Sequence, residues 1–213
     1  MKYYPVYLDL CDRPCVVIGG GAVAERKALA LLEAGAEVTV ISPTLTEKLL
    51  ALSASGKISH LPKHYEEKDL FGEFLVIAAT DSAEVNTRVA RECRKKHVLV
   101  NAATRPGESN FIVPSVVERG DLLISISTSG ASPALARKIR QDVEQRYGAE
   151  YGIFLDKLSL IRKRVLEEIA DESSRRRVFQ TIVDSDVIDL IGQGKTHEAE
   201  LRMEELAGLK HRG

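Results

Sequence analysis

The sequence has few cysteines, no excess of charge and no long hydrophobic run. Its three cysteines, Cys11, Cys15 and Cys93, are an odd number, and Cys11 and Cys15 are too few to enclose a metal, so we expect all three to be reduced packing residues. A net charge of -1 argues against a nucleic-acid partner, because phosphate binding is driven by clustered cations. No apolar run approaches the roughly 18 residues that span a bilayer, which argues against a membrane partner.

Targeting signals are also lacking. The first residues show neither the apolar stretch nor the small-residue cleavage site of a secretory signal, and the other end shows no anchor, so we expect a cytoplasmic protein. At 213 residues the chain exceeds the usual single-domain size of about 100 to 150 residues, which predicts one domain plus a smaller partner.

The first half alternates short β-branched runs with helical patterns, the order that produces parallel strands joined by helices. Strands are predicted at 15–18, 37–41, 58–61, 74–78 and 98–100, and helices near 22–34, 44–54 and 82–96. The fold class is therefore α/β, with a Rossmann-type doubly wound parallel sheet at the N-terminus.

The pattern changes after residue 110. Short strands are predicted at 111–113, 116–117 and 122–127, and helices at 133–147, 150–170, 173–182, 185–191 and 196–207. With no crossover helix between them, these strands should be antiparallel or lie at an edge. We divide the chain into a Rossmann NAD-binding domain (1–113), a small antiparallel dimerisation region with its helix (114–147) and an α-helical C-terminal domain (148–213). Because unpaired strand edges seek partners, we expect a homodimer.

A glycine-rich segment, Gly19 to Ala24, directly follows the first predicted strand and fits the pattern G-x-G-x-x-A. Gly19 permits the tight turn, and Gly21 lets the backbone approach a pyrophosphate. The N–H groups of Ala22 and Val23 begin the helix and would face the phosphates. The segment predicts a dinucleotide-binding loop; the alternative is a glycine turn that binds nothing.

The acid that usually binds the adenosine ribose is missing from the end of the second strand, where the sequence has Ser42, Pro43 and Thr44. Ser42 could bond a ribose hydroxyl, but a serine is also compatible with a 2′-phosphate. Three cations could reach such a phosphate: Arg26, Lys27 and Lys48. The residues alone therefore leave NAD and NADP open.

Further cofactor contacts are predicted beyond the fourth and fifth strands, because open sheets bind ligands at the carboxyl ends of their strands. Ala79, Thr80 and Asn101 occupy these positions. We expect Asp81 to cap the helix that begins near Ala83.

A second candidate anion site precedes the helix that starts at Pro133. Its small and hydroxyl residues are Ser127, Thr128, Ser129, Gly130 and Ser132. Hydroxyl and N–H groups at a helix N-terminus suit carboxylates, and Arg137 follows within about a turn and a half. The alternative is ordinary helix capping by Ser132.

Together with the Asn110-Phe111-Ile112-Val113-Pro114-Ser115 segment, these motifs make the sequence resemble the siroheme synthase N-terminal family. These are precorrin-2 dehydrogenases, of which some members are also sirohydrochlorin ferrochelatases. The resemblance covers at least residues 3–147. It implies oxidation of precorrin-2, an acidic tetrapyrrole, by hydride transfer to NAD, with Fe2+ as a possible further substrate. It also implies a homodimer and favours NAD over NADP.

The resemblance also implies an aspartate as acid–base group after the fifth strand, where this sequence has Thr104. A threonine cannot accept a proton at neutral pH, so Thr104 and the nearby Glu108 are both named as catalytic candidates, and Arg105 as a substrate contact. The five histidines form no ligand pair at helical spacing, so the iron ligands stay unknown. The alternative function is a non-catalytic NAD-binding sensor.

Overall fold

The computed structural model describes residues 3–209 except 104 and 105, with the side chain of Pro106 also left undescribed. The chain forms two compact units, Met1–Val113 and Pro114–Gly213. Each unit has its own hydrophobic core. Within the described residues, no helix is both long and apolar enough to cross a membrane.

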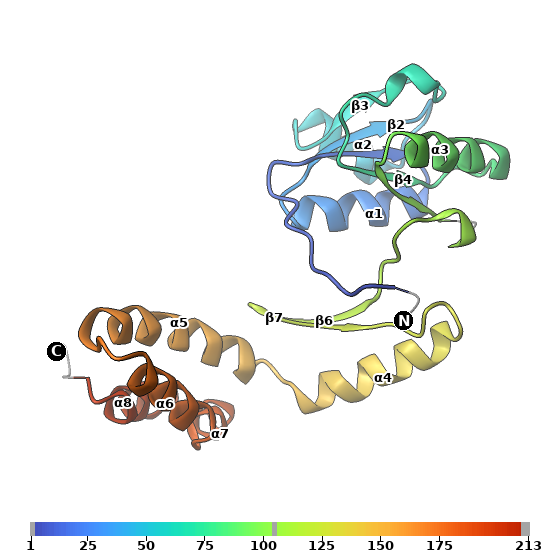
Figure 1. Ribbon diagram of the computed structural model, residues 1–213. Helices are drawn as coiled ribbons and strands as arrows, with labels where there is room; N and C mark the ends of the chain where they lie inside the picture. The colour runs from blue at the N-terminus through green and yellow to red at the C-terminus, as the bar shows by residue number, and fades with distance from the viewer. Residues whose placement is uncertain (1–2, 104–105, 210–213) are drawn as a thin grey trace. The chain divides into compact units, whose positions relative to one another are not determined.

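The first unit is built on a parallel sheet with the strand order β3-β2-β1-β4-β5 (Figure 1). Its strands are β1 (Pro14–Ile18), β2 (Glu37–Ile41), β3 (Ser59–Leu61), β4 (Leu75–Ala78) and β5 (Leu99–Ala102). The chain moves outward from β1 to β3 and then returns to β4 beside β1, so the strand order reverses between β1 and β4. Open sheets bind ligands at such a reversal, beyond the carboxyl ends of the strands. The predicted fold class is confirmed.

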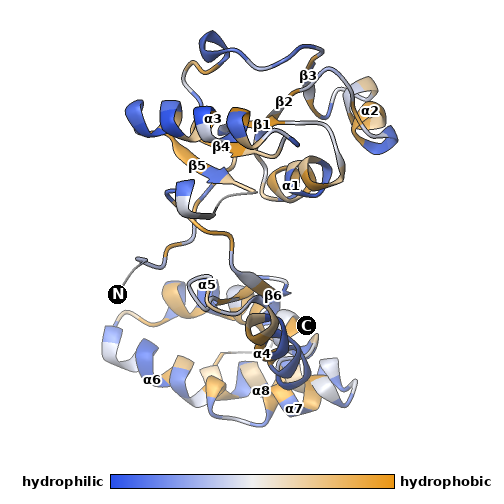
Figure 2. Ribbon diagram, turned by 90° about the vertical axis from the view of Figure 1, so that its right-hand side faces the viewer, coloured by the Kyte–Doolittle hydropathy of each residue, from blue (hydrophilic) through white to orange (hydrophobic). Residues whose placement is uncertain are grey.

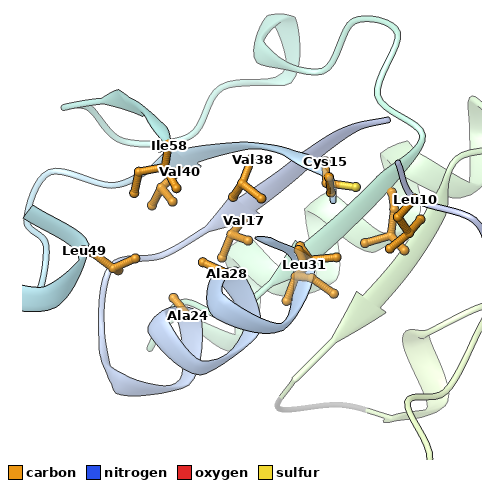
Figure 3. Packing of buried hydrophobic residues seen from close by; sticks show 13 residues of the cluster. Leu10, Cys15, Val17, Ala24, Ala28, Leu31, Val38, Val40, Leu49 and Ile58 are labelled. Atoms are coloured by element: carbon orange, nitrogen blue, oxygen red, sulfur yellow. The ribbon is translucent and has the colours of Figure 1, made fainter. Parts of the chain in front are cut away.

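Two apolar layers cover the sheet. On one face, Val17, Val38 and Val40 pack against α1 (Ala22–Glu33) and α2 (Glu47–Ala54), as Figure 3 shows. On the other face, Val16 and Val76 pack against α3 (Ala83–Lys95). Burial on both faces explains why the strands read as continuous apolar runs rather than alternating ones.

The cysteines divide between these layers and the surface. Cys15 lies in the first layer and Cys93 in the second, and both are buried free thiols. Cys11 is also free but exposed, so the expectation that it packs in the core is wrong. It lies in the loop before β1, where it meets solvent rather than a helix.

The crossover from β3 to β4 contains only a short 3₁₀ helix, η1 (Glu67–Asp69), instead of an α-helix. Tyr65 and Leu70 flank it and are buried against the second layer. This short crossover forms one wall of the site described below.

The strand predicted at 111–113 is wrong, because residues 109 and 110 meet the edge of β5 instead, mainly through their side chains, while Asn110 N donates to Val100 O (3.0 Å). Val100 N donates to Asn110 Oδ1 (2.7 Å), and Ala102 N donates to Ser109 Oγ (2.9 Å). These side chains occupy the hydrogen-bonding positions that another strand would use. The edge of β5 is therefore covered without a sixth strand.

The second unit contains one antiparallel hairpin and five helices among its described residues. These are β6 (Ser115–Arg119), β7 (Leu122–Ile126), α4 (Pro133–Arg146), α5 (Glu150–Glu168), α6 (Glu172–Val183), α7 (Val187–Gly192) and α8 (Thr196–Ala207). Apolar and hydrophilic residues alternate along the helices (Figure 2), and Phe154, Val165 and Met203 lie in their shared core. A Cβ on Gly152 would lie 2.8 Å from the carbonyl oxygen of Arg119, so the start of α5 is packed tightly on the hairpin.

Candidate functional site

A cavity of about 580 Å³ lies in the first unit at the carboxyl ends of β1, β2 and β4. Its lining segments are the glycine loop (19–21), the segment after β2 (41–46), the segment after β4 (79–82), the crossover wall (63–65), and Val85 and Arg88 of α3. This is the strand-order reversal, where a doubly wound sheet holds a dinucleotide.

Gly19 and Gly21 behave differently within the loop. Gly19 has φ +120°, and a Cβ there would lie 2.4 Å from the carbonyl oxygen of Ala79, so a side chain is excluded twice. Gly21 has φ -85°, and a Cβ there would meet nothing within 4 Å. The open space at Gly21 fits a backbone that approaches a pyrophosphate closely. The backbone of Gly19 has the conformation of the predicted tight turn, whereas the role of Gly21 beside a pyrophosphate stays a prediction.

Gly20 is a site residue that sequence analysis misses, because G-x-G-x-x-A leaves this position open. A Cβ on Gly20 would lie 1.9 Å from the carbonyl oxygen of Thr44. Its own carbonyl accepts a hydrogen bond from Thr46 N (3.0 Å). The segment after β2 is therefore packed directly on the glycine loop. The third glycine in the run was the available signal.

Thr46 and Glu25 join the same two loops and are also missed by sequence analysis. Thr46 Oγ1 donates to Glu25 Oε2 (2.5 Å) and accepts from Leu49 N (3.3 Å), which makes Thr46 the N-cap of α2. That cap explains why α2 begins at Glu47 rather than at the predicted residue 44. No local pattern connects residues 21 positions apart.

A buried asparagine fixes the loop after β4. Asn86 Oδ1 accepts from Thr80 N (3.1 Å) and Thr80 Oγ1 (2.8 Å), and its amide donates to Thr80 O (2.9 Å). Ser82, not Asp81, caps α3 by accepting from Val85 N (3.3 Å), because its hydroxyl is the one placed at the helix start. The predicted capping role of Asp81 is wrong, and its exposed side chain lines the cavity instead.

The other predicted cofactor residues divide into two groups. Ser42, Pro43, Thr44, Ala79 and Thr80 all line the cavity. Ala22 and Val23 begin α1, so their N–H groups are among those that the helix itself leaves unbonded. Asn101 instead donates its amide to Phe111 O (3.2 Å), outside the cavity lining.

The basic side chains in the cavity differ from those expected. Lys63, His64 and Arg88 line it, whereas Arg26, Lys27 and Lys48 do not. Burial is the main cause that lowers the pKa of Lys27. The crossover wall supplies Lys63 and His64, and sequence analysis could not place this irregular segment.

The serine-rich loop lies in the second unit, and its hydroxyls bond within the loop. Thr128 Oγ1 donates to Ser132 O (3.1 Å) and accepts from Ser132 N (3.1 Å). Ser127 Oγ accepts from Ser129 N (3.0 Å). Ser132 Oγ accepts from Leu135 N (3.2 Å), so the capping alternative is realised in the structure. Gly130 and Arg137 are exposed beside these groups.

Three family models match consecutive parts of this chain. Residues 6–115 match the model described as putative NAD(P)-binding, residues 119–146 match the sirohaem biosynthesis protein central model, and residues 150–206 match the sirohaem synthase dimerisation region. The chain belongs to the sirohaem synthase N-terminal family. The resemblance inferred from the motifs is confirmed, and the cavity lies within the residues that match the putative NAD(P)-binding model.

Curated relatives carry the name siroheme synthase. One from Thioalkalivibrio sulfidiphilus is 38% identical over 96% of this chain and 42% of its own length. Another from Methylobacillus flagellatus is 38% identical over 94% of this chain and 47% of its own length. The chain thus spans less than half of each of these two relatives. A solved structure of SirC, precorrin-2 dehydrogenase, is 29% identical, covers 95% of this chain and 100% of that chain, and has a TM-score of 0.81.

Of the two acid–base candidates predicted from the sequence, the structure describes Glu108 but not Thr104. Thr104 and Arg105 lie outside the described residues. Glu108 belongs to the 3₁₀ helix η2 (Pro106–Glu108), and its Oε1 accepts from Thr87 Oγ1 of α3 (2.9 Å). Among the described side chains, no group of three or more His, Cys, Asp or Glu could hold a metal ion.

Proposed function

We propose that this chain oxidises precorrin-2, an acidic tetrapyrrole, to sirohydrochlorin, with NAD as the hydride acceptor. One observation carries the proposal: a dinucleotide cavity at the strand-order reversal, in a chain similar over 95% of its length to SirC, precorrin-2 dehydrogenase. Glycine loop, helix start and cavity match what a bound dinucleotide requires.

The first unit's role is to hold and orient the cofactor. The N–H groups of Ala22 and Val23 at the start of α1 would hold the pyrophosphate, and the open space at Gly21 would allow its close approach. Ser42 and Thr44, which line the cavity at the end of β2, would hold the adenosine ribose. Bound NAD supplies the hydride acceptor, and transfer needs the two reacting atoms held roughly 3 to 3.5 Å apart.

The loop after β4 provides the rigidity that such positioning needs. Thr80 cannot shift without breaking its bonds to buried Asn86. Each hydrogen bond contributes about 1 kcal/mol to the folded state, so the loop is held more firmly than a solvent-exposed turn. We therefore assign Asn86 as a positioning residue of the cofactor site.

The carboxylates of the substrate are assigned to the second unit and the segment after β5. The hydroxyls of Ser127, Thr128 and Ser129, the backbone N–H of Gly130, and Arg137 would bind them, and Arg105 is a further candidate from the sequence. Glu108 would accept the proton that leaves as the hydride is transferred, because the threonine at the family's acid–base position, Thr104, cannot do so at neutral pH. Insertion of Fe2+ releases two pyrrole protons, so it depends on this proton acceptor more than the oxidation does.

A homodimer is part of the proposal. Residues 150–206 match the sirohaem synthase dimerisation region, and this region exposes large apolar side chains: Leu160, Leu166 and Val183. Covering such side chains by a second copy would remove them from water. Light scattering should give twice the mass of the chain across micromolar concentrations, and a monomeric mass throughout would contradict the dimer.

The test is anaerobic turnover of precorrin-2 with NAD, followed by the absorbance of sirohydrochlorin. Fe2+ is added only after the oxidation is complete, and iron uptake is compared with an enzyme-free blank. Oxidation at a rate that depends on enzyme and NAD is the expected result. Tight NAD binding without oxidation would contradict the proposal and favour the sensor alternative.

A further inference from the structure

The adenosine end of the cavity lacks the usual selection against NADP. The acid that repels a 2′-phosphate in many Rossmann domains is replaced by Ser42, which is buried at the end of β2. Lys63, His64 and Arg88 line the same cavity. A cavity with these side chains and no acid at β2 would be expected to accept the 2′-phosphate of NADP.

The charge of Lys63 is already neutralised within the crossover. Its ammonium forms an ion pair with Asp69, whose side chain is only 6% exposed, and lies 3.6 Å from Glu66 Oε2. The hydrogen bond to Asp69 raises the pKa of Lys63 above its usual value. A lysine paired in this way attracts a 2′-phosphate less strongly than a free ammonium group does.

Asp69 is held in place by the backbone as well. Its Oδ2 accepts from Glu66 N (2.8 Å), which forms the capping box of η1. The carboxylate therefore stays on the wall where it can hold Lys63. The side chain of Asp69 is largely covered, but that of Lys63 is 39% exposed, so solvent partly screens the pair.

Arg88 is fixed by the same crossover. Its guanidinium lies 5.6 Å from the ring centroid of Tyr65 and donates to Tyr65 O (3.4 Å). The phenol of Tyr65 in turn donates to the buried carboxylate of Glu92. The guanidinium is thus directed toward the crossover backbone, although it lines the cavity.

We propose that Asp69 determines the preference for NAD over NADP by holding Lys63 in an ion pair on the crossover wall. Asp69 touches no cofactor in this scheme; it is a positioning residue that acts through Lys63. The inference rests on the proposed use of NAD. In this scheme Asp69, on the crossover between β3 and β4, disfavours NADP in place of the acid that is missing at the end of β2.

The test is Asp69→Asn in the full chain, with NADH and NADPH titrated separately. Asparagine still accepts the bond from Glu66 N but no longer neutralises Lys63. The chain has no tryptophan, so the fluorescence of each reduced cofactor is read directly.

The expected result is an affinity for NADPH about tenfold higher in Asp69→Asn than in the wild type, with NADH affinity unchanged within about twofold. Adding Lys63→Met to Asp69→Asn should remove the gain for NADPH. Thermal unfolding of every variant checks that the crossover still folds.

The failures are distinguishable. A wild type that binds NADPH as tightly as NADH overturns both the cofactor part of the proposed function and this inference. A wild type that prefers NADH, with an unchanged preference in a folded Asp69→Asn variant, overturns the inference alone. A gain for NADPH that survives Lys63→Met also overturns it, because the gain would not act through Lys63.

Discussion

Substituting alanine for Gly20 or for Gly21 is expected to separate the stability of the first unit from its affinity for the cofactor. In Gly20→Ala the new Cβ would lie 1.9 Å from the carbonyl oxygen of Thr44, so the segment after β2 must move. That movement strains the bond from Thr46 N to Gly20 O (3.0 Å) and the cap of α2. In Gly21→Ala the new methyl group meets nothing within 4 Å.

The two variants should therefore lose different quantities. Forcing packed backbone apart typically costs about 1–3 kcal/mol, and a lost N-cap costs about 1 kcal/mol, so Gly20→Ala should lose about 3 kcal/mol of stability. For a unit of this size that corresponds to a fall in Tm of roughly 10 °C. Gly21→Ala should keep its Tm within about 2 °C. Its methyl group would obstruct the pyrophosphate and weaken NADH binding by about 10- to 100-fold, equal to about 1.4–2.8 kcal/mol.

Thermal unfolding by circular dichroism gives the first quantity, and titration of NADH fluorescence gives the second. A Gly21→Ala variant that binds NADH like the wild type would refute the assignment of the pyrophosphate to this loop. A Gly20→Ala variant that unfolds at the wild-type temperature would refute the close packing of the two loops.

Three further changes test other parts of the structure. Asn86→Ala should lower the free energy of unfolding by about 2–3 kcal/mol and weaken NADH binding, because three hydrogen bonds to the loop after β4 are lost. Urea unfolding and NADH titration measure the two effects. An unchanged urea midpoint would contradict the claim that Asn86 holds this loop. Burial raises the pKa of Cys15 to about 11 and that of Cys93 to about 12, from an ordinary value of 9.0. Since each pKa is higher in the folded chain, the free energy of unfolding should be constant with respect to these thiols below about pH 9 and fall above it by roughly 1.4 kcal/mol per pH unit for each thiol. Cys93→Ala should make this pH dependence shallower in urea unfolding. An identical pH dependence would contradict the raised pKa of Cys93. Gly152→Ala places a Cβ 2.8 Å from a hairpin carbonyl oxygen and should destabilise the second unit by about 1–3 kcal/mol. Amide hydrogen exchange should become faster in α5 and the hairpin but not in the parallel sheet. An equal increase in exchange throughout the chain would refute a local effect.

The regular elements follow from local patterns in the sequence. Continuous apolar runs such as Val16 to Ile18 predict strands buried on both faces, and the glycines at 19–21 mark the turn that follows. The apolar run at 111–113 predicts a strand by the same reasoning, and this is wrong. Ser109 and Asn110 meet the edge of β5 with their side chains, and apolar periodicity carries no information about such bonds.

The contacts that shape the site depend on how loops converge at the end of the sheet. Thr46 and Glu25 meet only because β1 and β2 are neighbours, and Asn86 meets Thr80 only after α3 folds back. Lys63 and its ion pair lie on an irregular crossover that no period describes. Local patterns in the sequence therefore predict the glycine loop and the strand ends but not the residues that hold them in place.

The hydrogen bonds that Ser109 and Asn110 make to the edge of β5 affect how the chain folds while it is being synthesised. Ser109 and Asn110 follow the backbone groups that they bond by only 7 and 10 residues. Ribosomes deliver the N-terminal part of a chain first, and an open strand edge on a nascent domain can pair with nascent neighbours. Because these two residues are synthesised immediately after β5, the first unit can finish folding before the second unit emerges. Neighbouring nascent chains on the same messenger RNA then find the edge of β5 already hydrogen-bonded and cannot pair with it.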